Sequence, residues 1–278
     1  MAYSVSPTDP KIKKQLLLTI SIVTFNPEFD ELRKTLSSLK IALNELPPSA
    51  FSITIVDNSL CNEVASFLLH SYPQLPIRLI QGHGNIGFGR AHNLAIQHMG
   101  EFHLILNPDI QLDPDALINA LAFMKANASC GLLTPYATWP NGQRQYLCKC
   151  YPAVFDLLLR GFAPKIVRSL FSMRLARYEL QTETQNEVYW NPPIVSGCFM
   201  FFRSIILKGT GGFNDKFFLY FEDFDLAIRA RKIANIAYVP TIRVVHAGGH
   251  ASRKGFWHIK IFIKSAMTFY QTHGLKLL

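Results

Sequence analysis

Acidic residues are missing from the C-terminal part of this sequence. No Asp or Glu follows Asp225, whereas nine Lys and Arg residues do. Those nine cations equal the net charge of +9 of the whole chain, so the preceding part is balanced. A stretch with charge of one sign is suited to an anionic membrane or another polyanion, and it also raises solubility. The composition alone leaves both interpretations open.

Long apolar runs and patterned cysteines are missing as well. No segment approaches the ~18 uninterrupted apolar residues of a membrane-spanning helix. The lysines before the apolar run 16–23 imitate a secretory signal, but no small-residue cleavage site follows, and a buried first strand fits better. The five cysteines have the spacing of neither a zinc site nor a disulfide framework. They favour reduced thiols in a cytosolic protein.

The residues that are present suffice for a large folded core. Hydrophobic residues make up 49% of the 278 residues and charged residues 17%, which argues against global disorder. Apolar, β-branched runs of strand length recur, and most lack the alternation of a half-exposed strand, so we expect both of their faces to be buried. These runs occupy residues 18–25, 53–56, 77–80, 102–106, 195–202, 236–239 and 242–245.

Helical patterns separate the earlier runs. Leu32, Leu36 and Leu39 recur on one helical face, and Asp113-Pro114 is typical of a helix start. Residues 151–188 favour short amphipathic helices with a basic face. The alternation in the first half predicts an α/β fold, with a Rossmann-like, mostly parallel central sheet flanked by helices. Ligands of such sheets bind beyond the C-terminal ends of the strands.

Two acids follow predicted strands at that edge of the sheet. Asp57 follows the run 53–56 and can accept hydrogen bonds from a base or ribose, although it can equally cap a helix or form a turn. Asp109 follows the run 102–106, where a carboxylate can hold Mg²⁺ or Mn²⁺ against a diphosphate. Asn107-Pro108-Asp109 is also good turn chemistry, so the local sequence does not separate these two roles.

A glycine-rich loop lies between these two acids. Residues 82–87 read Gly-His-Gly-Asn-Ile-Gly, which formally matches the fingerprint of NAD-type dinucleotide-binding oxidoreductases. The loop follows the third predicted strand rather than the first, which makes that interpretation the weaker one. A loop of this kind can also approach the phosphates of another nucleotide.

An acid cluster lies at residues 222–225, Glu-Asp-Phe-Asp, directly after the aromatic-rich stretch 217–221. One acid here is explained by the start of a helix, where the helix dipole favours negative charge. Three acids in four residues are less well explained in that way. The cluster is therefore a candidate for acid–base chemistry.

Six motifs in a fixed order resemble one known family. The chain is similar to inverting glycosyltransferases of family 2, which have the GT-A fold, and most similar to the bacterial rhamnosyltransferases that use dTDP-L-rhamnose in surface-polysaccharide assembly. The resemblance covers roughly residues 18 to 274. Its motifs lie at residues 24–26, 56–58, 85–93, 106–109, 196–200 and 211–226.

The resemblance implies a role for each matching residue. Asp223 would be the general base, with Asp225 as second choice, and Asn107-Pro108-Asp109 would occupy the place of the metal-binding D-x-D. Asn107 replaces the first acid of that motif, which implies a weaker site for Mg²⁺ or Mn²⁺ at Asp109, to which His246 would contribute. The residues implied to hold the nucleotide sugar are Thr24, Asn26, Asp57, Asn58, Asn85, Gly87, Arg90, Asn93, Asn107 and Asp109.

The resemblance also implies a division of the chain. A GT-A domain would span residues 18–250, with a nucleotide-binding half over 18–112 and an acceptor half over 113–250. Residues 1–17 would be an extension and residues 251–278 a basic amphipathic segment. The expected reaction moves L-rhamnose from dTDP-L-rhamnose onto a lipid-diphosphate-linked saccharide.

The basic segment places the expected enzyme in the cytoplasm, peripheral at the inner face of the cell membrane. The expected contacts with the anionic surface combine cations and aromatic residues. A non-catalytic polyanion-binding module remains the alternative of another class, and no nucleic-acid partner is expected. The contact residues are Arg253, Lys254, Trp257, Lys260, Phe262 and Lys264.

Overall fold

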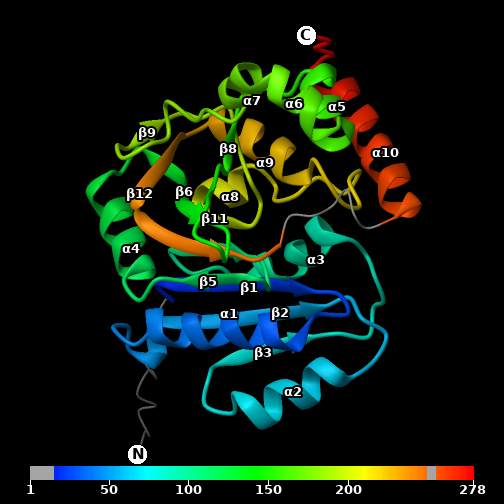
Figure 1. Ribbon diagram of the computed structural model, residues 1–278. Helices are drawn as coiled ribbons and strands as arrows, with labels where there is room; N and C mark the ends of the chain where they lie inside the picture. The colour runs from blue at the N-terminus through cyan, green and yellow to red at the C-terminus, as the bar shows by residue number, and fades with distance from the viewer. Residues whose placement is uncertain (1–15, 249–254) are drawn as a thin grey trace, which may run out of the picture.

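A ten-stranded central sheet runs through the protein, with helices packed on both of its faces (Figure 1). This computed structural model describes residues 16–248 and 255–278. The order of the main strands is β3-β2-β1-β4-β11-β6-β12-β5, with β7 beside β6 and β9 beside β12. The α/β class predicted from the sequence is confirmed.

The N-terminal half of the sheet is parallel. Its four strands pair in register with one another, and the helices that connect them return the chain to the same edge. The carboxyl ends of all four strands therefore meet at one edge. The strands are β1 (Leu18–Thr24), β2 (Phe51–Asp57), β3 (Ile77–Ile80) and β4 (Phe102–Leu106), and the helices are α1 (Phe29–Ala42), α2 (Glu63–Ser71) and α3 (Phe88–Ala95).

The C-terminal half of the sheet is mixed, so the expectation of a mostly parallel sheet holds only for the first half. β11 (Phe199–Arg203) is antiparallel to both β4 and β6 (Cys130–Thr138). The expected strands at 236–239 and 242–245 are one strand, β12 (Asn235–His246), which shifts register at Pro240 because proline has no N–H to donate to the ladder. β12 runs parallel to β6 and antiparallel to β5 (Ile110–Leu112).

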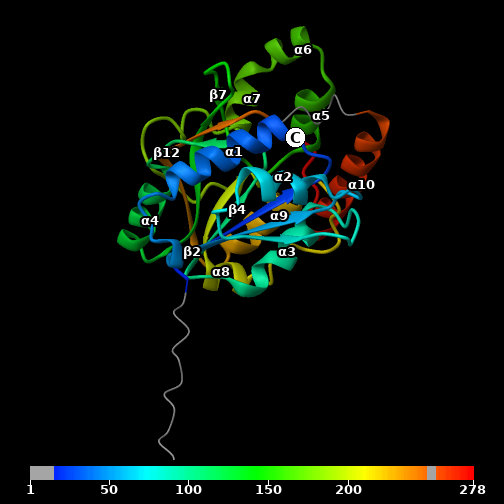
Figure 2. The same cartoon turned by 90° about the horizontal axis from the view of Figure 1, so that it is seen from below.

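The remaining helices and short strands lie around this sheet. Among them, α5, α6, α7 and α10 gather at one end of the molecule in both views (Figures 1 and 2). The helices are α4 (Ala116–Ala126), α5 (Val154–Phe162), α6 (Lys165–Leu170), α7 (Ser172–Tyr178), α8 (Ser204–Gly209), α9 (Glu222–Arg231) and α10 (Phe256–His273), and the short strands are β7 (Arg144–Gln145), β8 (Cys148–Lys149), β9 (Tyr189–Trp190) and β10 (Ile194–Val195).

Alternation along the strands explains why both faces of the sheet carry helices. Ile20 and Ile22 of β1 share a buried cluster with Leu36 of α1, whereas Val23 joins Ala91 of α3 in another. Successive side chains of a strand point to opposite faces, so each strand needs apolar cover on both sides. This explains the near-continuous apolar runs in the sequence.

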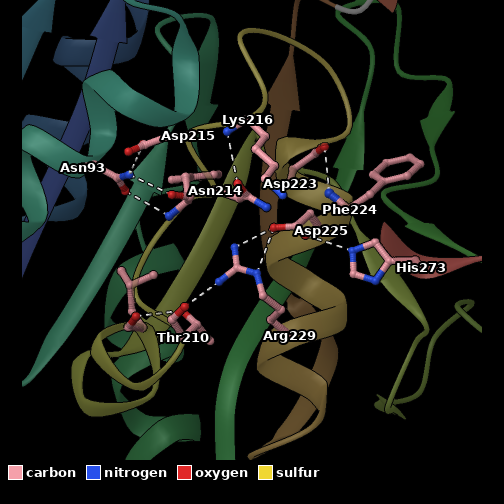
Figure 3. Close-up of polar contacts among 12 residues, drawn as sticks. Asn93, Thr210, Asn214, Asp215, Lys216, Asp223, Phe224, Asp225, Arg229 and His273 are labelled. Atoms are coloured by element: carbon pink, nitrogen blue, oxygen red, sulfur yellow. Dashed lines mark hydrogen bonds and ion pairs between the residues drawn. The ribbon is translucent and has the colours of Figure 1, made fainter. Parts of the chain in front are cut away.

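The buried carboxylate of Asp225 connects α9 to α10. The Asp225 carboxylate is fully buried; its Oδ2 lies 2.7 Å from Nη2 of Arg229 and its Oδ1 lies 2.9 Å from Nε2 of His273 in the last turn of α10 (Figure 3). Farther along α10, the Ser265 hydroxyl donates to the carbonyl of Leu219 at 2.7 Å. The C-terminal helix is therefore bound to the segment that carries the acid cluster.

We expect Asp225→Ala to lower the free energy of unfolding by ~3–5 kcal/mol, because it leaves the partly buried Arg229 without its counter-charge and His273 without its hydrogen-bond partner. Urea unfolding followed by circular dichroism measures this. The matched control is Lys34→Gln, which removes the exposed Lys34–Glu31 pair and should change the stability by less than ~1 kcal/mol. Equal stability of the two variants would contradict a fastening role for Asp225.

Candidate active site

The carboxyl ends of β1 and β2 form a polar corner. The Thr24 hydroxyl donates to Oδ1 of Asp57 at 2.9 Å, and the N–H and hydroxyl of Ser59 donate to the same oxygen at 3.1 and 2.7 Å. The other oxygen, Oδ2, is buried and has no partner within the described chain. A buried carboxylate oxygen without a partner is costly, which makes Oδ2 a ready acceptor for a ribose hydroxyl or a base N–H.

The glycine loop closes over this corner. The Asn58 amide donates to the carbonyl of Gly87 at 3.3 Å, and Oδ1 of Asn85 accepts from the Gly87 N–H at 3.1 Å. Gly87 has φ of 93°, and a Cβ there would lie 2.4 Å from the carbonyl oxygen of Phe218. Only glycine permits both the backbone conformation and this approach. Asn26 lies beside the corner, where its N–H donates to the Ser59 hydroxyl at 2.8 Å.

Arg90 and Asn93 both contact the loop that follows α8. Nε of Arg90 donates to the carbonyl of Asp215 at 3.0 Å. The Asn93 side chain makes two bonds to the backbone of Phe213, at 2.8 and 2.9 Å (Figure 3). These contacts hold the loop at 213–215 against α3. The role that the resemblance implies for both residues, beside the diphosphate and sugar, stays a prediction.

The end of β4 brings Asn107, Asp109 and His246 together. The Thr35 hydroxyl of α1 donates to the carbonyl of Pro108 at 2.8 Å, which fixes the turn that follows β4. Oδ1 of Asp109 lies 3.4 Å from Nε2 of His246 at the end of β12. Oδ1 of Asn107 and Oδ1 of Asp109 are both buried without a hydrogen bond among the described residues.

A hydrogen bond to Gln145 fixes the orientation of the His246 ring. Its Nδ1 lies 2.8 Å from Oε1 of Gln145, and because an amide oxygen only accepts, Nδ1 carries a proton and Nε2 faces Asp109. Burial lowers the pKa of His246, but the neighbouring Cys198 and Asp109 outweigh it and raise the pKa to about 10. An outer hydrogen bond of this kind is typical of histidines that bind metal through the other nitrogen.

Asp109 and His246 fit a divalent cation whose remaining ligands come from a bound substrate and water. Over residues 16–248 and 255–278, no three His, Cys, Asp or Glu side chains are grouped as a metal site. Asp109 and His246 supply one carboxylate and one imidazole, and Mg²⁺ or Mn²⁺ commonly takes further ligands from phosphates and water. Gly248 leaves the space open, since a Cβ there would lie 1.8 Å from Oδ2 of Asp109.

Asp223 is held by two backbone N–H groups. Gly197 donates to its Oδ2 at 2.8 Å, and Phe224 donates to its Oδ1 at 2.9 Å (Figure 3). Burial raises the pKa of Asp223, although these two bonds oppose the rise. Tyr220 and Phe221, which precede it, have φ of 69° and 65°, a left-handed conformation that non-glycine residues rarely adopt.

A cavity of about 370 Å³ opens beside Asp223. Its wall combines residues of α5, α9 and α10 with the aromatic segment before α9. Asp225 does not line it, because its carboxylate is buried in contacts with Arg229 of α9 and His273 of α10. Of the two candidate bases, Asp223 is thus the one in reach of a ligand. The lining residues are Leu157, Arg160, Gly161, Tyr178, Ser196, Tyr220, Phe221, Glu222, Asp223, Phe224, His258, Ile259 and Phe262.

Some residues of the cavity and of the His246 site were not identified from the sequence. Tyr178, which lines the cavity, comes from a segment predicted only as amphipathic helix. Gln145, which contacts His246, comes from a segment with no predicted element. Phe262, expected at a membrane surface, packs inward with its ring centroid 5.1 Å from that of Phe221. Arg253 and Lys254, expected beside it, lie outside the described residues.

Comparison with known proteins agrees with this geometry. The model of the family "Glycosyl transferase family 2" matches residues 19–210. The chain is 26% identical over 273 residues to an N-acetylglucosaminyl-diphospho-decaprenol L-rhamnosyltransferase of Mycobacterium tuberculosis, covering 91% of this chain and 83% of that protein. It is 23% identical over 192 residues to the rhamnosyltransferase WbbL of Escherichia coli, covering 64% and 69%.

Solved structures share the fold at low identity. A mannosyltransferase of Pyrobaculum calidifontis in complex with GDP-Man and Mn²⁺ matches with a TM-score of 0.59 and 18% identity, covering 95% of this chain and 73% of that one. TarS of Staphylococcus aureus matches with a TM-score of 0.57 and 18% identity over 92% of this chain, which spans 40% of the TarS chain. The predicted GT-A fold is confirmed.

The family model covers more than half of the chain and includes the polar corner, the glycine loop and the Asn107–Asp109 turn. The ordered motifs, the GT-A sheet and the matching relatives all lead to one assignment. The chain belongs to glycosyl transferase family 2.

Proposed function

We propose that this protein transfers L-rhamnose from dTDP-L-rhamnose, with inversion, onto a lipid-diphosphate-linked saccharide. The single observation that carries the catalytic part is the Asp223 carboxylate, half-buried, fixed by two N–H groups and facing a cavity of about 370 Å³. The choice of sugar and acceptor rests on the similarity to rhamnosyltransferases, one of which is named for a diphospholipid-linked acceptor. Family membership favours this over an oxidoreductase or a non-catalytic module.

The donor nucleotide is assigned to the half at residues 18–112 and the acceptor to residues 113–250. Thr24, Asn26 and Asn58 shape the corner in which Oδ2 of Asp57 accepts from the nucleoside. Asn85 and Gly87 border the diphosphate through the loop backbone. A helix N-terminus follows directly at Phe88, whose positive dipole end favours the anionic diphosphate.

Asp109 and His246 would hold Mg²⁺ or Mn²⁺. When bound, the ion would neutralise the charge that develops on the departing diphosphate. Nε2 of His246 and Oδ1 of Asp109 face each other at 3.4 Å, and Gln145 keeps the His246 ring in place. Mn²⁺ is present in the mannosyltransferase and GalNAc-T7 structures that share the fold, which supports this assignment.

Asp223 removes the proton from the attacking hydroxyl. The hydroxyl oxygen forms the bond to C1 of the donor sugar while the bond from C1 to the diphosphate breaks, so the configuration at C1 inverts. The proton ends on the Asp223 carboxylate and the electron pair of the broken bond leaves with dTDP. Burial raises the pKa of Asp223 toward the range in which a carboxylate is an effective base.

The helical end around α6 and α10 is assigned to a membrane surface. The outer face of α10 exposes Phe256, Ile263 and Met267 beside Lys260 and Lys264, and α6 exposes Ile166 at 79%. Apolar side chains mixed with cations on one helical face suit the interface of an anionic bilayer. None of the described helices is both long and apolar enough to cross one. α10 also walls the cavity beside Asp223, so an acceptor anchored in lipid would be delivered to the base.

Asp223→Asn should reduce transfer ~10²–10⁴-fold, the usual worth of a positioned base, because the amide has no lone pair basic enough to take the proton. Turnover is measured with dTDP-L-rhamnose and a short-chain polyprenyl-diphosphate N-acetylglucosamine. Stabilisation by dTDP should persist, which separates loss of chemistry from loss of fold. Asp115→Asn, an exposed acid at the start of α4, is the matched control. Transfer near the wild-type rate would remove Asp223 from the mechanism.

Asp109→Ala should abolish the part of dTDP stabilisation that depends on Mn²⁺, because the carboxylate that holds the ion is lost. Thermal shifts with dTDP are compared with and without Mn²⁺, in wild type, Asp109→Ala and the exposed control Asp113→Ala. Wild-type activity that survives EDTA would contradict the metal assignment and leave Asp109 as a hydrogen-bond acceptor.

Replacing Lys260 and Lys264 by Gln should weaken binding to vesicles rich in phosphatidylglycerol ~30-fold at low salt, at ~1 kcal/mol per cation. Co-sedimentation measures the binding. The control is the double variant Lys40→Gln and Lys125→Gln, which removes the same charge from exposed sites on α1 and α4. Equal loss in both doubles would mean that net charge matters and that α10 does not.

A further inference from the structure

Two buried polar atoms in the wall of the cavity beside Asp223 have no hydrogen-bond partner among the described residues. The Tyr178 side chain is 2% exposed and Glu222 is 5% exposed, and both line the cavity. The Tyr178 hydroxyl and Oε2 of Glu222 make no hydrogen bond among the described residues. An unpaired buried polar atom costs ~1–3 kcal/mol, so two of them on one cavity wall require an explanation.

The rest of the wall has the character of a sugar site. Tyr220, Phe224 and Phe262 contribute aromatic rings to the wall. Among the described residues that line the cavity, Arg160 is the only Lys or Arg. The Arg160 side chain is about half exposed. An apolar cavity with a few converging polar groups is typical of small-molecule sites. An exposed guanidinium at its rim suits a phosphate.

Glu222 is suited to donate rather than only to accept. Burial raises its pKa well above the ordinary range, and the neighbouring Asp223 raises it further. The two carboxyls therefore do not both ionise readily, and the proton stays on Glu222 when Asp223 is the free base. A protonated carboxyl and a phenol each offer one O–H donor to a ligand.

We propose that Tyr178 and Glu222 form the subsite that binds hydroxyl groups of the acceptor sugar, with Arg160 facing the phosphate attached to that sugar. The proposal rests on the proposed function and adds the residues that select the acceptor. Both side chains line the cavity, and a hydrogen bond to a sugar hydroxyl would satisfy a polar atom that has no partner among the described residues. Tyr178 lies in α7, so the helical insertion before β9 supplies specificity to the base on α9.

The test compares Tyr178→Phe with Thr134→Val, since Thr134 is another buried hydroxyl without a partner, on β6 and outside the cavity lining. Tyr178→Phe should raise the acceptor KM about five- to tenfold, the worth of one hydrogen bond, with kcat within about twofold. Its thermal unfolding should be no lower than wild type, because an unpaired group is removed. Thr134→Val should leave the acceptor KM unchanged.

Glu222 is tested by a pair of variants. Glu222→Gln keeps an N–H donor and should retain most acceptor affinity, whereas Glu222→Leu should lose it. Arg160→Gln should weaken binding of N-acetylglucosamine 1-phosphate but not of N-acetylglucosamine itself. Titration of these two sugars into donor-free protein, followed by NMR, measures both effects without turnover.

The direct titration also separates the subsite from the reaction. If binding of the sugar phosphate depends on Tyr178 and Arg160 but no donor supports transfer, the subsite stands and the proposed function fails. If transfer occurs but Tyr178→Phe changes neither the acceptor KM nor sugar binding, the subsite is overturned and the proposed function stands.

Discussion

The site depends on how closely segment 213–223 packs against both halves of the sheet. On one side the N–H of Phe88 donates to the carbonyl of Phe218 at 3.0 Å, an approach that only Gly87 allows. On the other side, a Cβ at Gly197 would lie 2.8 Å from Cβ of Asp223. Two glycines far apart in the sequence therefore let one segment pack against the glycine loop on one side and against the chain just before β11, beside Asp223, on the other.

The same packing explains the electrostatics of the site. The two neighbouring carboxyls of Glu222 and Asp223 lose hydration in the wall of the cavity, and burial raises the pKa of each. Two N–H bonds to Asp223 favour its charged form, whereas one oxygen of Glu222 has no hydrogen-bond partner among the described residues. Adjacent carboxyls thus take different roles because their hydrogen bonds differ, one suited to accept a proton and the other to keep one.

The donor half was predictable from the sequence because its information is local. Each acid follows its strand directly in the sequence. The apolar pattern of the strands therefore sufficed to place Asp57 and Asp109 at the edge of the sheet. The contact of His246 with Asp109 also matches the resemblance. The sheet of the second half was not predictable, because β11 enters between β4 and β6 after the α5–α7 excursion. The contacts of Arg90 and Asn93 with residues 213–215 were not predictable for the same reason, since these partners lie far along the chain.

The C-terminal helix α10 contributes both to the cavity beside Asp223 and to the surface proposed to face the membrane. Its inner face contributes His258, Ile259 and Phe262 to the cavity, and its last turn holds Asp225 through His273. Its outer face exposes apolar and cationic side chains, and these alternate with the inner ones at helical spacing. One amphipathic helix therefore meets both requirements of a lipid-linked acceptor, because its outer face suits the bilayer while its inner face shapes the pocket. A loss of the Asp225–His273 contact would then disturb the cavity beside Asp223 before it reached the polar corner at the ends of β1 and β2, which lies on the other half of the sheet.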